Sequence, residues 1–306
     1  MTPSTEAVRA ALPHSRCAGG GTVPLILPLP GEPPAPCGRT SCQERLDAEL
    51  DALRAILSGS PPDACLPPAD EADRVRHRWL TGHHAAFCVW QLLPPGLYAL
   101  AAAPERATTR LLAWTTALYD VYSVLFLYSG SCTPEQYATL VRPGMAAAHP
   151  AFSGEWARDH APVSAALRAV RDRHPAPLLT LLGGAVRDNQ RVHMAVARRL
   201  VPEGASLLQQ AGRSAGHGPT EAEQALYDAH FQVERGPVCR PAHRAQLVRL
   251  LAGCVADIGA HGLGTLPDGC PERFGREALA RLVAVAVCEE PPQISRIPEP
   301  PKGRNT

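Results

Sequence analysis

Lysine is almost absent from this sequence of 306 residues, since Lys302 is the only one among 30 basic residues. The formal net charge is +1 and no block of basic residues occurs, which argues against an electrostatic surface for nucleic acid. No continuous apolar run approaches the roughly 20 residues that a membrane-spanning helix needs. The N-terminus also lacks the apolar segment of a signal peptide. We therefore expect a cytoplasmic protein that binds neither nucleic acid nor membrane.

Closely paired cysteines are missing as well. The ten cysteines are spread along the chain without a CxxC pair. In a cytoplasmic protein this spacing favours reduced thiols over disulfides, and it predicts no structural zinc site. No glycine-rich phosphate loop occurs, and neither GxSxG nor HExxH is present. Any chemistry is thus expected to come from the 12 histidines.

The order of segments indicates one helical domain between two proline-rich ends. We expect an arm over 1–40, a helical domain over 41–289 and a tail over 290–306. Runs of alternating polar and β-branched residues are absent, so no sheet is expected. The apolar stretch 23–30 of the arm has two possible roles. It either wraps around a second subunit of a homodimer or is a disordered or self-packed leader.

Helical spacing of apolar residues sets the expected elements of the domain. A capping box at Ser41–Glu44 predicts the start of a helix that ends near Gly59. Between Leu111 and Leu127 the only charged residue is Asp120, so this helix should be central in the bundle. The expected helices cover 41–59, 70–93 (ended by Pro94 and Pro95), 104–128, 162–173, 176–201, 220–232, 241–259 and 272–288.

Two segments carry histidine at helical spacing. In the first, RHRWLTGHHAAFCVWQLL (76–93), His84 and Cys88 share one face, while His83, Phe87 and Trp90 share the neighbouring one. Such a strip suits either the wall of a pocket for an aromatic substrate or an aromatic seam in the core. The pair His84 and Cys88 has metal-ligand spacing, but two ligands alone make a weak site.

The second segment is LLTLLGGAVRDNQRVHMAVARRLV (178–201), which contains His193. Steps of three and four place His193 on one stripe with Leu182, Asn189 and Val196. We therefore predict that His193 is buried and uncharged. A neutral imidazole in such a place is either a hydrogen-bonded core residue or a metal ligand.

These two segments resemble a known superfamily. GHHAAFCVWQ is similar to the HHxxxFxxxHQ-type segment of the tryptophan 2,3-dioxygenase superfamily, and NQRVHMAVARRL is similar to its proximal-histidine helix. The resemblance covers about residues 70–215. Chain length and composition further resemble the haem-dependent L-tyrosine 3-hydroxylases of natural-product pathways. Gln91 stands where the dioxygenases have a second histidine, which favours a phenol over an indole.

The resemblance implies a helical bundle that encloses a haem, and it implies roles for individual residues. His193 would bind the iron, with Asn189 as the partner of its other ring nitrogen. His84, or alternatively His83, would be the distal acid–base group. Further implied contacts are the packing of the substrate ring by Phe87 and Trp90 and the binding of its carboxylate by Arg213 and Ser214.

The activity that follows from this resemblance is ortho-hydroxylation of L-tyrosine to L-DOPA by hydrogen peroxide. A b-type haem is expected, and a single thioether bond through Cys88 is the alternative. Two other functions remain open from the sequence. One is a haem dioxygenase that opens an indole ring, and the other is a scaffold without cofactor whose proline-rich ends bind a partner.

Overall fold

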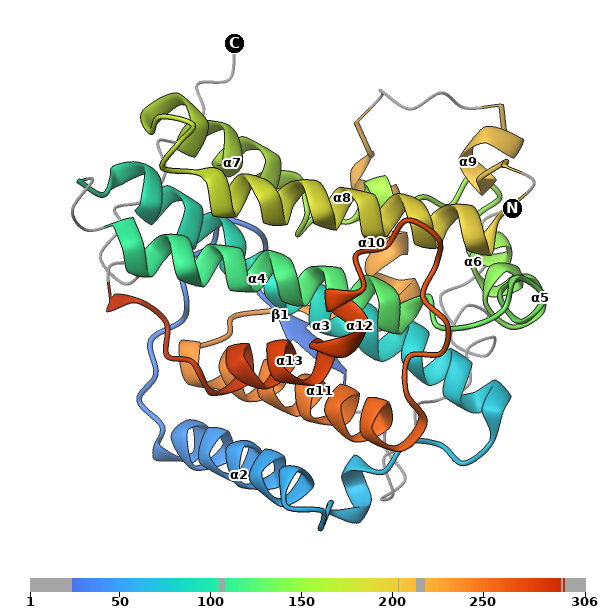
Figure 1. Ribbon diagram of the computed structural model, residues 1–306, viewed down its shortest axis with the longest axis horizontal. Coiled ribbons are helices and arrows are strands. Elements are labelled where there is room, and N and C mark those ends of the chain that lie inside the picture. The colour runs from blue at the N-terminus through green and yellow to red at the C-terminus, as the bar shows by residue number, and fades with distance from the viewer. Residues whose placement is uncertain (1–23, 105–107, 203, 213–217, 293, 295–306) are drawn as a thin grey trace.

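The most apolar long helix, α4 (Thr108–Ser129), occupies the centre of the computed structural model (Figure 1), which describes residues 24–104, 108–202, 204–212, 218–292 and 294. Helices α3 (Glu71–Ala102), α8 (Thr180–Leu200) and α13 (Ala278–Val287) pack around it. Because α4 is covered on several sides, nearly all of its residues can be apolar. The predicted all-α class and the central place of this helix are confirmed.

The long helices form layers, which Figure 1 shows from top to bottom. Helix α7 (Ala161–Arg173) packs on α3, and α8 packs on α4. Below α3 and α4 lie α11 (Arg240–His261) and α13, and α2 (Thr40–Leu57) packs on the outer side of α11. The core therefore lies mainly along α3, α4 and α11.

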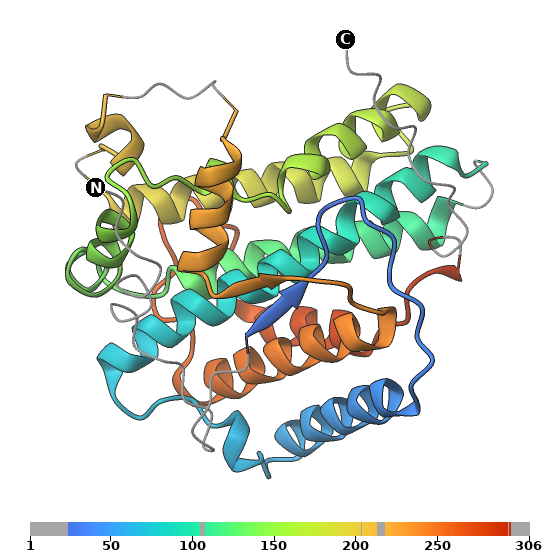
Figure 2. The ribbon, with the colours of Figure 1, turned by 180° about the vertical axis from the view of Figure 1, so that it is seen from behind.

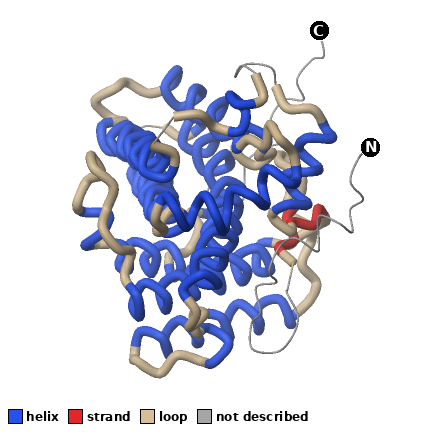
Figure 3. The backbone as a smooth tube through the Cα atoms, turned by 90° about the vertical axis from the view of Figure 1, so that its right-hand side faces the viewer, coloured by secondary structure: helices blue, strands red, loops and turns tan. Residues whose placement is uncertain are grey.

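Short elements connect these layers, and Figure 3 shows that helix dominates the described chain. The helix predicted over 220–232 is found at Glu221–His230, and the one predicted over 272–288 is divided into two helices, Arg273–Arg276 and Ala278–Val287. The short elements are η1 (Asp63–Cys65), α5 (Pro134–Gln136), the π-turn η3 (Tyr137–Val141), α6 (Arg142–Ala148), η4 (Gly154–Trp156), α9 (Leu207–Gln210), α10 (Glu221–His230) and α12 (Arg273–Arg276).

The expectation of no sheet is wrong. Strand β1 (Leu25–Leu27), within the proline-rich arm, pairs in parallel with β2 (Val233–Arg235), and Figure 2 shows the two strands beside α11. The other edge of β1 is satisfied by one side chain, because Gln246 of α11 accepts a hydrogen bond from Ile26 N and donates one to Ile26 O. Leu25 and Leu27 are buried, so this part of the arm packs on its own chain.

Helix α3 does not end at Pro94 and Pro95, as the sequence predicted, but runs through both to Ala102. A proline in a helix interior costs about 3 kcal/mol. Beyond the prolines, Leu97 and Leu100 are completely buried. Burying a leucine contributes about 1.5–3 kcal/mol. Packing of this last stretch therefore offsets the missing backbone hydrogen bonds.

The capping box predicted at Ser41–Glu44 does not form. Helix α2 begins at Thr40, with Arg39 as its N-cap residue and no capping hydrogen bond from that side chain.

The sequence showed no continuous apolar run of about 20 residues, yet both α3 and α4 are long and apolar enough to cross a membrane by length and composition alone. Most of that apolar surface is buried inside the protein, as expected for core helices.

Candidate functional site

The adjacent histidines of α3 are enclosed by protein. Nε2 of His84 lies 2.5 Å from the carbonyl oxygen of Phe231, to which the neutral ring donates. His83 donates from Nδ1 to the carbonyl oxygen of Trp79 at 2.6 Å, and its ring stacks on that of Phe231. Burial lowers the pKa of His83 to about 3 and that of His84 to about 4. Both rings are therefore uncharged at neutral pH and hold the start of β2 against α3.

The aromatic strip of α3 forms a packed seam. The ring of Phe87 lies 5.3 Å from that of Trp90, which in turn meets Tyr122 of α4 edge-on at 5.3 Å. Phe87 and Trp90 are both buried. Cys88 has no exposed surface, and burial raises its pKa. The alternative of a thioether bond between haem and Cys88 therefore has no accessible thiol in this arrangement.

His193 is exposed, so the prediction that it is buried is wrong. The buried stripe of α8 passes through Asn189, Val192 and Val196, and His193 lies at its edge because a helical step turns each residue by about 100°. Its ring stacks on Phe126 of α4, with centroids 4.5 Å apart and planes 9° apart. Although the ring is exposed, the surrounding protein desolvates it and lowers its pKa.

Asn189 does not contact His193 through its amide group in the described structure. Its side-chain nitrogen donates to the hydroxyl of Ser123 on α4 at 3.2 Å. Asn189 is buried, and this contact fastens α8 to α4 one turn before His193. No hydrogen bond of His193 is found within the described residues, so its ring nitrogens are available to a ligand.

A second histidine, which the sequence did not single out, lies close to His193. His160 precedes α7, and its ring meets that of Trp90 edge-on at 5.0 Å. Burial, and to a smaller extent the proximity of His193, lower the pKa of His160. His160 follows a segment without helical periodicity, which is why sequence reasoning missed it. The only local signal is its place just before Pro162, a residue favoured in the first turn of a helix.

The segment that carries His160 is anchored by its neighbour Asp159. The buried carboxylate of Asp159 accepts two hydrogen bonds from Arg235 of β2, both at 2.9 Å, and a third from Gln91 of α3. Arg235 also binds Asp228 of α10, and both Gln91 and Arg235 donate to the carbonyl oxygen of Pro28. The small sheet thus holds the loop before α7 in place.

A groove of about 520 Å³ lies between α7 and α8. This volume is within the usual range of ligand sites. The basic side chains on its walls are Arg171, His174 and Arg187. The ring of His174 is fixed, because it donates from Nε2 to the carbonyl oxygen of Leu100 at 2.8 Å. Neither His160, which precedes α7, nor His193 of α8 lines this groove.

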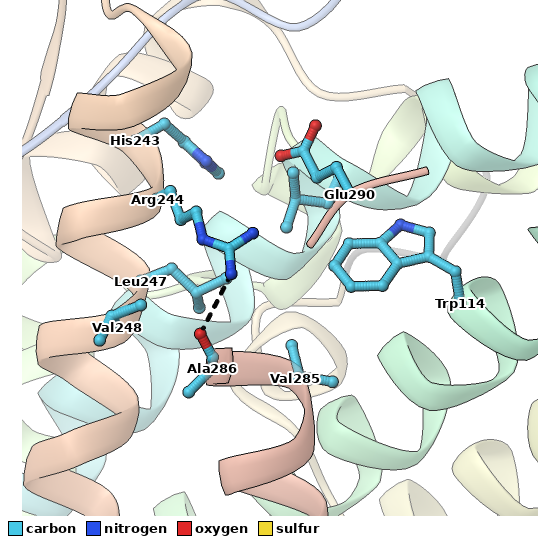
Figure 4. Close-up of a pocket in the computed structure, with 9 residues that line it drawn as sticks. Trp114, His243, Arg244, Leu247, Val248, Val285, Ala286 and Glu290 are labelled. Carbon is cyan, nitrogen blue, oxygen red and sulfur yellow. Dashed lines mark hydrogen bonds between the residues drawn. The ribbon is translucent and has the colours of Figure 1, made fainter. Parts of the chain in front are cut away.

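A second cavity lies between α4, α11 and α13 (Figure 4). Its volume of about 10 Å³ has room for roughly one water molecule. In this cavity Arg244 donates to the carbonyl oxygen of Ala286 at 3.4 Å, and Nε2 of His243 is buried without a hydrogen-bond partner among the described residues. A single water would satisfy that nitrogen. The cavity is too small for an organic substrate.

Two predicted contacts, Arg213 and Ser214, lie outside the described residues. The other predicted residues fall into two groups. His83, His84 and Phe87 pack around Phe231, whereas Trp90 and His193 lie near His160. Asn189 lies on α8 one turn before His193 and contacts Ser123 of α4. No direct contact between His84 and His193 is found in the described chain.

Comparison with known families gives one match. Residues 36–183 match the family described as SfmD 3-methyl-L-tyrosine peroxygenase, over 148 of the 306 residues, just under half of the chain. No curated protein matches the chain. The match supports an oxidoreductase of the peroxygenase type that modifies a tyrosine-type substrate. It includes His84 and His160 but ends ten residues before His193.

Proposed function

We propose that this protein hydroxylates the phenol ring of L-tyrosine, or of a ring-substituted tyrosine, with hydrogen peroxide and a bound haem. The reaction joins one peroxide oxygen to a ring carbon and releases the other as water, so the ring C–H becomes C–OH and no further reductant is needed. The observation that carries this proposal is the match of residues 36–183 to a tyrosine-modifying peroxygenase family. An ortho position gives L-DOPA from L-tyrosine.

The groups that would hold a haem are His193 on α8 and the arginines of the neighbouring groove. His193 supplies an uncharged ring without a hydrogen-bond partner among the described residues, which is the form that binds iron. Phe126 supports that ring by stacking. Arg171 and Arg187 on the neighbouring groove walls can pair with carboxylates, which both haem and an amino-acid substrate carry. His193 would therefore hold the haem iron.

A bound haem would supply the oxidation chemistry, and the protein would supply orientation and proton handling. The imidazole of a histidine ligand donates less electron density than a cysteine thiolate, so a nearby acid–base group matters more. His160 is the better placed group for this role, because it lies near His193 and uses no described side-chain hydrogen bond. Its lowered pKa leaves Nδ1 or Nε2 free to accept the proton that peroxide loses.

His84, the distal group implied by the sequence resemblance, is less suited to that role. Its Nε2–H is donated to the Phe231 carbonyl, and its side chain is buried. Moving a proton through this ring would require that hydrogen bond to break. We therefore assign proton transfer to His160, whose ring borders Trp90, and a positioning role to His84.

The test is product mass from the haem-loaded protein. L-tyrosine and 3-methyl-L-tyrosine are each incubated with hydrogen peroxide, and separately with molecular oxygen and a reductant. The proposal expects one added oxygen per product, labelled when the peroxide carries ¹⁸O. Absence of an oxygenated product with both substrates would contradict it. L-tryptophan gaining two oxygens would instead support the dioxygenase alternative.

A matched pair of variants tests the residue assignment. His160→Gln should retain haem and lose turnover by about 10²-fold or more, as expected for loss of general acid–base help. His149→Gln replaces another histidine of the connecting segment, one that contacts Trp156 and not Trp90. It should keep turnover near that of the unchanged protein. Equal activity of the two variants would remove His160 from the reaction.

A further inference from the structure

Three cysteines that are far apart in the sequence meet at one edge of the fold. The sulfur atoms of Cys37, Cys42 and Cys239 all lie within 4.8 Å of one another. Cys37 is in the loop before α2, Cys42 is in the first turn of α2, and Cys239 is the N-cap residue of α11. The spacing of these cysteines did not predict this cluster, because the third lies almost 200 residues after the second.

The backbone holds the cluster together. Ala35 N donates to the carbonyl oxygen of Val238 at 3.0 Å, which ties the arm to the residue before Cys239. Cys42 N donates to the carbonyl oxygen of Arg39 at 3.2 Å and closes the turn that separates Cys37 from Cys42. Helices α2 and α11 pack along each other, and Figure 1 shows that both begin on the same side of the molecule.

The cluster lies where two long helices begin. The N-terminal ends of α2, with 18 residues, and α11, with 22, lie beside the three sulfurs, which favours negative charge on them. Because all three sulfurs lie within 4.8 Å of one another, a single cation can contact all of them.

We propose that Cys37, Cys42 and Cys239 form a binding site for a thiophilic metal ion, with Zn²⁺ as the expected occupant. Zinc–sulfur bonds of about 2.3 Å in a tetrahedral site place the sulfurs about 3.8 Å apart. The cluster therefore has to contract by about 1 Å at most, and the exposed loop residue Cys37 can supply that movement. The exposed side leaves the fourth position to water or to an external ligand.

Such an ion would add a further link between three parts of the chain that are far apart in sequence. It would join the arm, the start of α2 and the start of α11 at a single point. Because the ligands come together only in the folded chain, metal binding would stabilise the fold. This site is separate from the groove between α7 and α8 and does not depend on the proposed oxidation chemistry.

The experiment measures zinc in the reduced, haem-loaded full chain. The protein is treated with a chelator, given Zn²⁺, passed through a desalting column and analysed for zinc and sulfur. One zinc per chain is expected, with protons released on binding and a higher thermal midpoint. Cd²⁺, used as a probe, should give thiolate charge-transfer absorption in the ultraviolet.

Single variants locate the ion. Cys37→Ser and Cys42→Ser, which change accessible residues, should each lose the bound zinc and the Cd²⁺ absorption. Cys288→Ser, which changes an exposed cysteine at the end of α13, should keep both. The proposal is overturned if the reduced protein retains no zinc, or if all three variants retain it equally. It is also overturned if two of the three sulfurs form a disulfide that reductant does not open.

Discussion

Replacing Asp159 by Asn tests how firmly the segment before His160 is held. The carboxylate is 3% exposed and accepts hydrogen bonds from both terminal nitrogens of Arg235 and from Gln91. Asparagine has nearly the same shape but carries no charge. Its amide nitrogen would face donors on at least one side, because all three partners donate.

The expected loss of stability depends on the ion pair that Arg235 keeps when Asp159 is replaced. Removing one partner of a buried ion pair costs about 3–5 kcal/mol when the other charge is left alone. Arg235 is not left alone, because Asp228 binds it through two further hydrogen bonds. A hydrogen bond to a charged group contributes about 1.5–3 kcal/mol. We therefore expect Asp159→Asn to lower the free energy of unfolding by about 2–3 kcal/mol.

The assay is urea unfolding, followed by circular dichroism. With a slope near 3 kcal/mol per molar urea, the midpoint should fall by about 0.7–1 M. Asp51→Asn is the matched control, since it makes the same chemical change in an exposed ion pair with Arg54. That pair should contribute no more than about 0.5 kcal/mol. Equal midpoints for the two variants would refute the assignment of Asp159 as an anchor.

Three other predictions concern stability. Arg78→Met should lower the free energy of unfolding in urea by about 3–5 kcal/mol, because the fully buried Asp257 would lose the two hydrogen bonds that its carboxylate oxygens accept from Arg78 at 2.7 and 2.8 Å. An unchanged urea midpoint would contradict this. Gly82→Ala should lower the thermal midpoint, because the added Cβ would meet the Ser129 hydroxyl at 2.1 Å, and an unchanged midpoint would show that α3 and α4 can separate at no cost. His84, with a pKa lowered by burial to about 4, stays neutral in the folded state while the unfolded state gains a proton below about pH 6.5. This group should therefore lower the free energy of unfolding by about 3 kcal/mol as the pH falls from 6.5 to 4. The urea midpoint of His84→Gln should fall less between these two pH values than that of the unchanged protein.

The sequence predicted those features that depend on residues close together in the chain. The apolar surface of α4 on all sides placed it at the centre of the bundle. Features that depend on distant residues were missed. The pairing of β1 with β2 joins segments about 200 residues apart, and only the fold shows that Leu25 and Leu27 are core residues.

In the candidate site, too, the sequence predicted features that depend on local spacing and missed those that depend on distant residues. Helical spacing correctly found Asn189 on the buried face of α8, but it wrongly continued the buried stripe through His193, where the structure buries Val192. Contact with α4 decides in favour of Val192. His160 lies in a connecting segment, where no periodicity marks a buried or functional face. Its place beside Trp90 results from the anchoring of Asp159 by Arg235, a contact between distant residues.

The central claim, that His193 holds a haem, is tested most directly by haem titration of two neighbouring variants. Both His193 and Met194 are exposed on α8, so alanine at either position leaves the packing of that helix largely unchanged. His193→Ala should lose the Soret absorption of the haem-loaded protein, or bind haem far more weakly, whereas Met194→Ala should match the unchanged protein. The same Soret band and haem affinity in both variants would contradict the account.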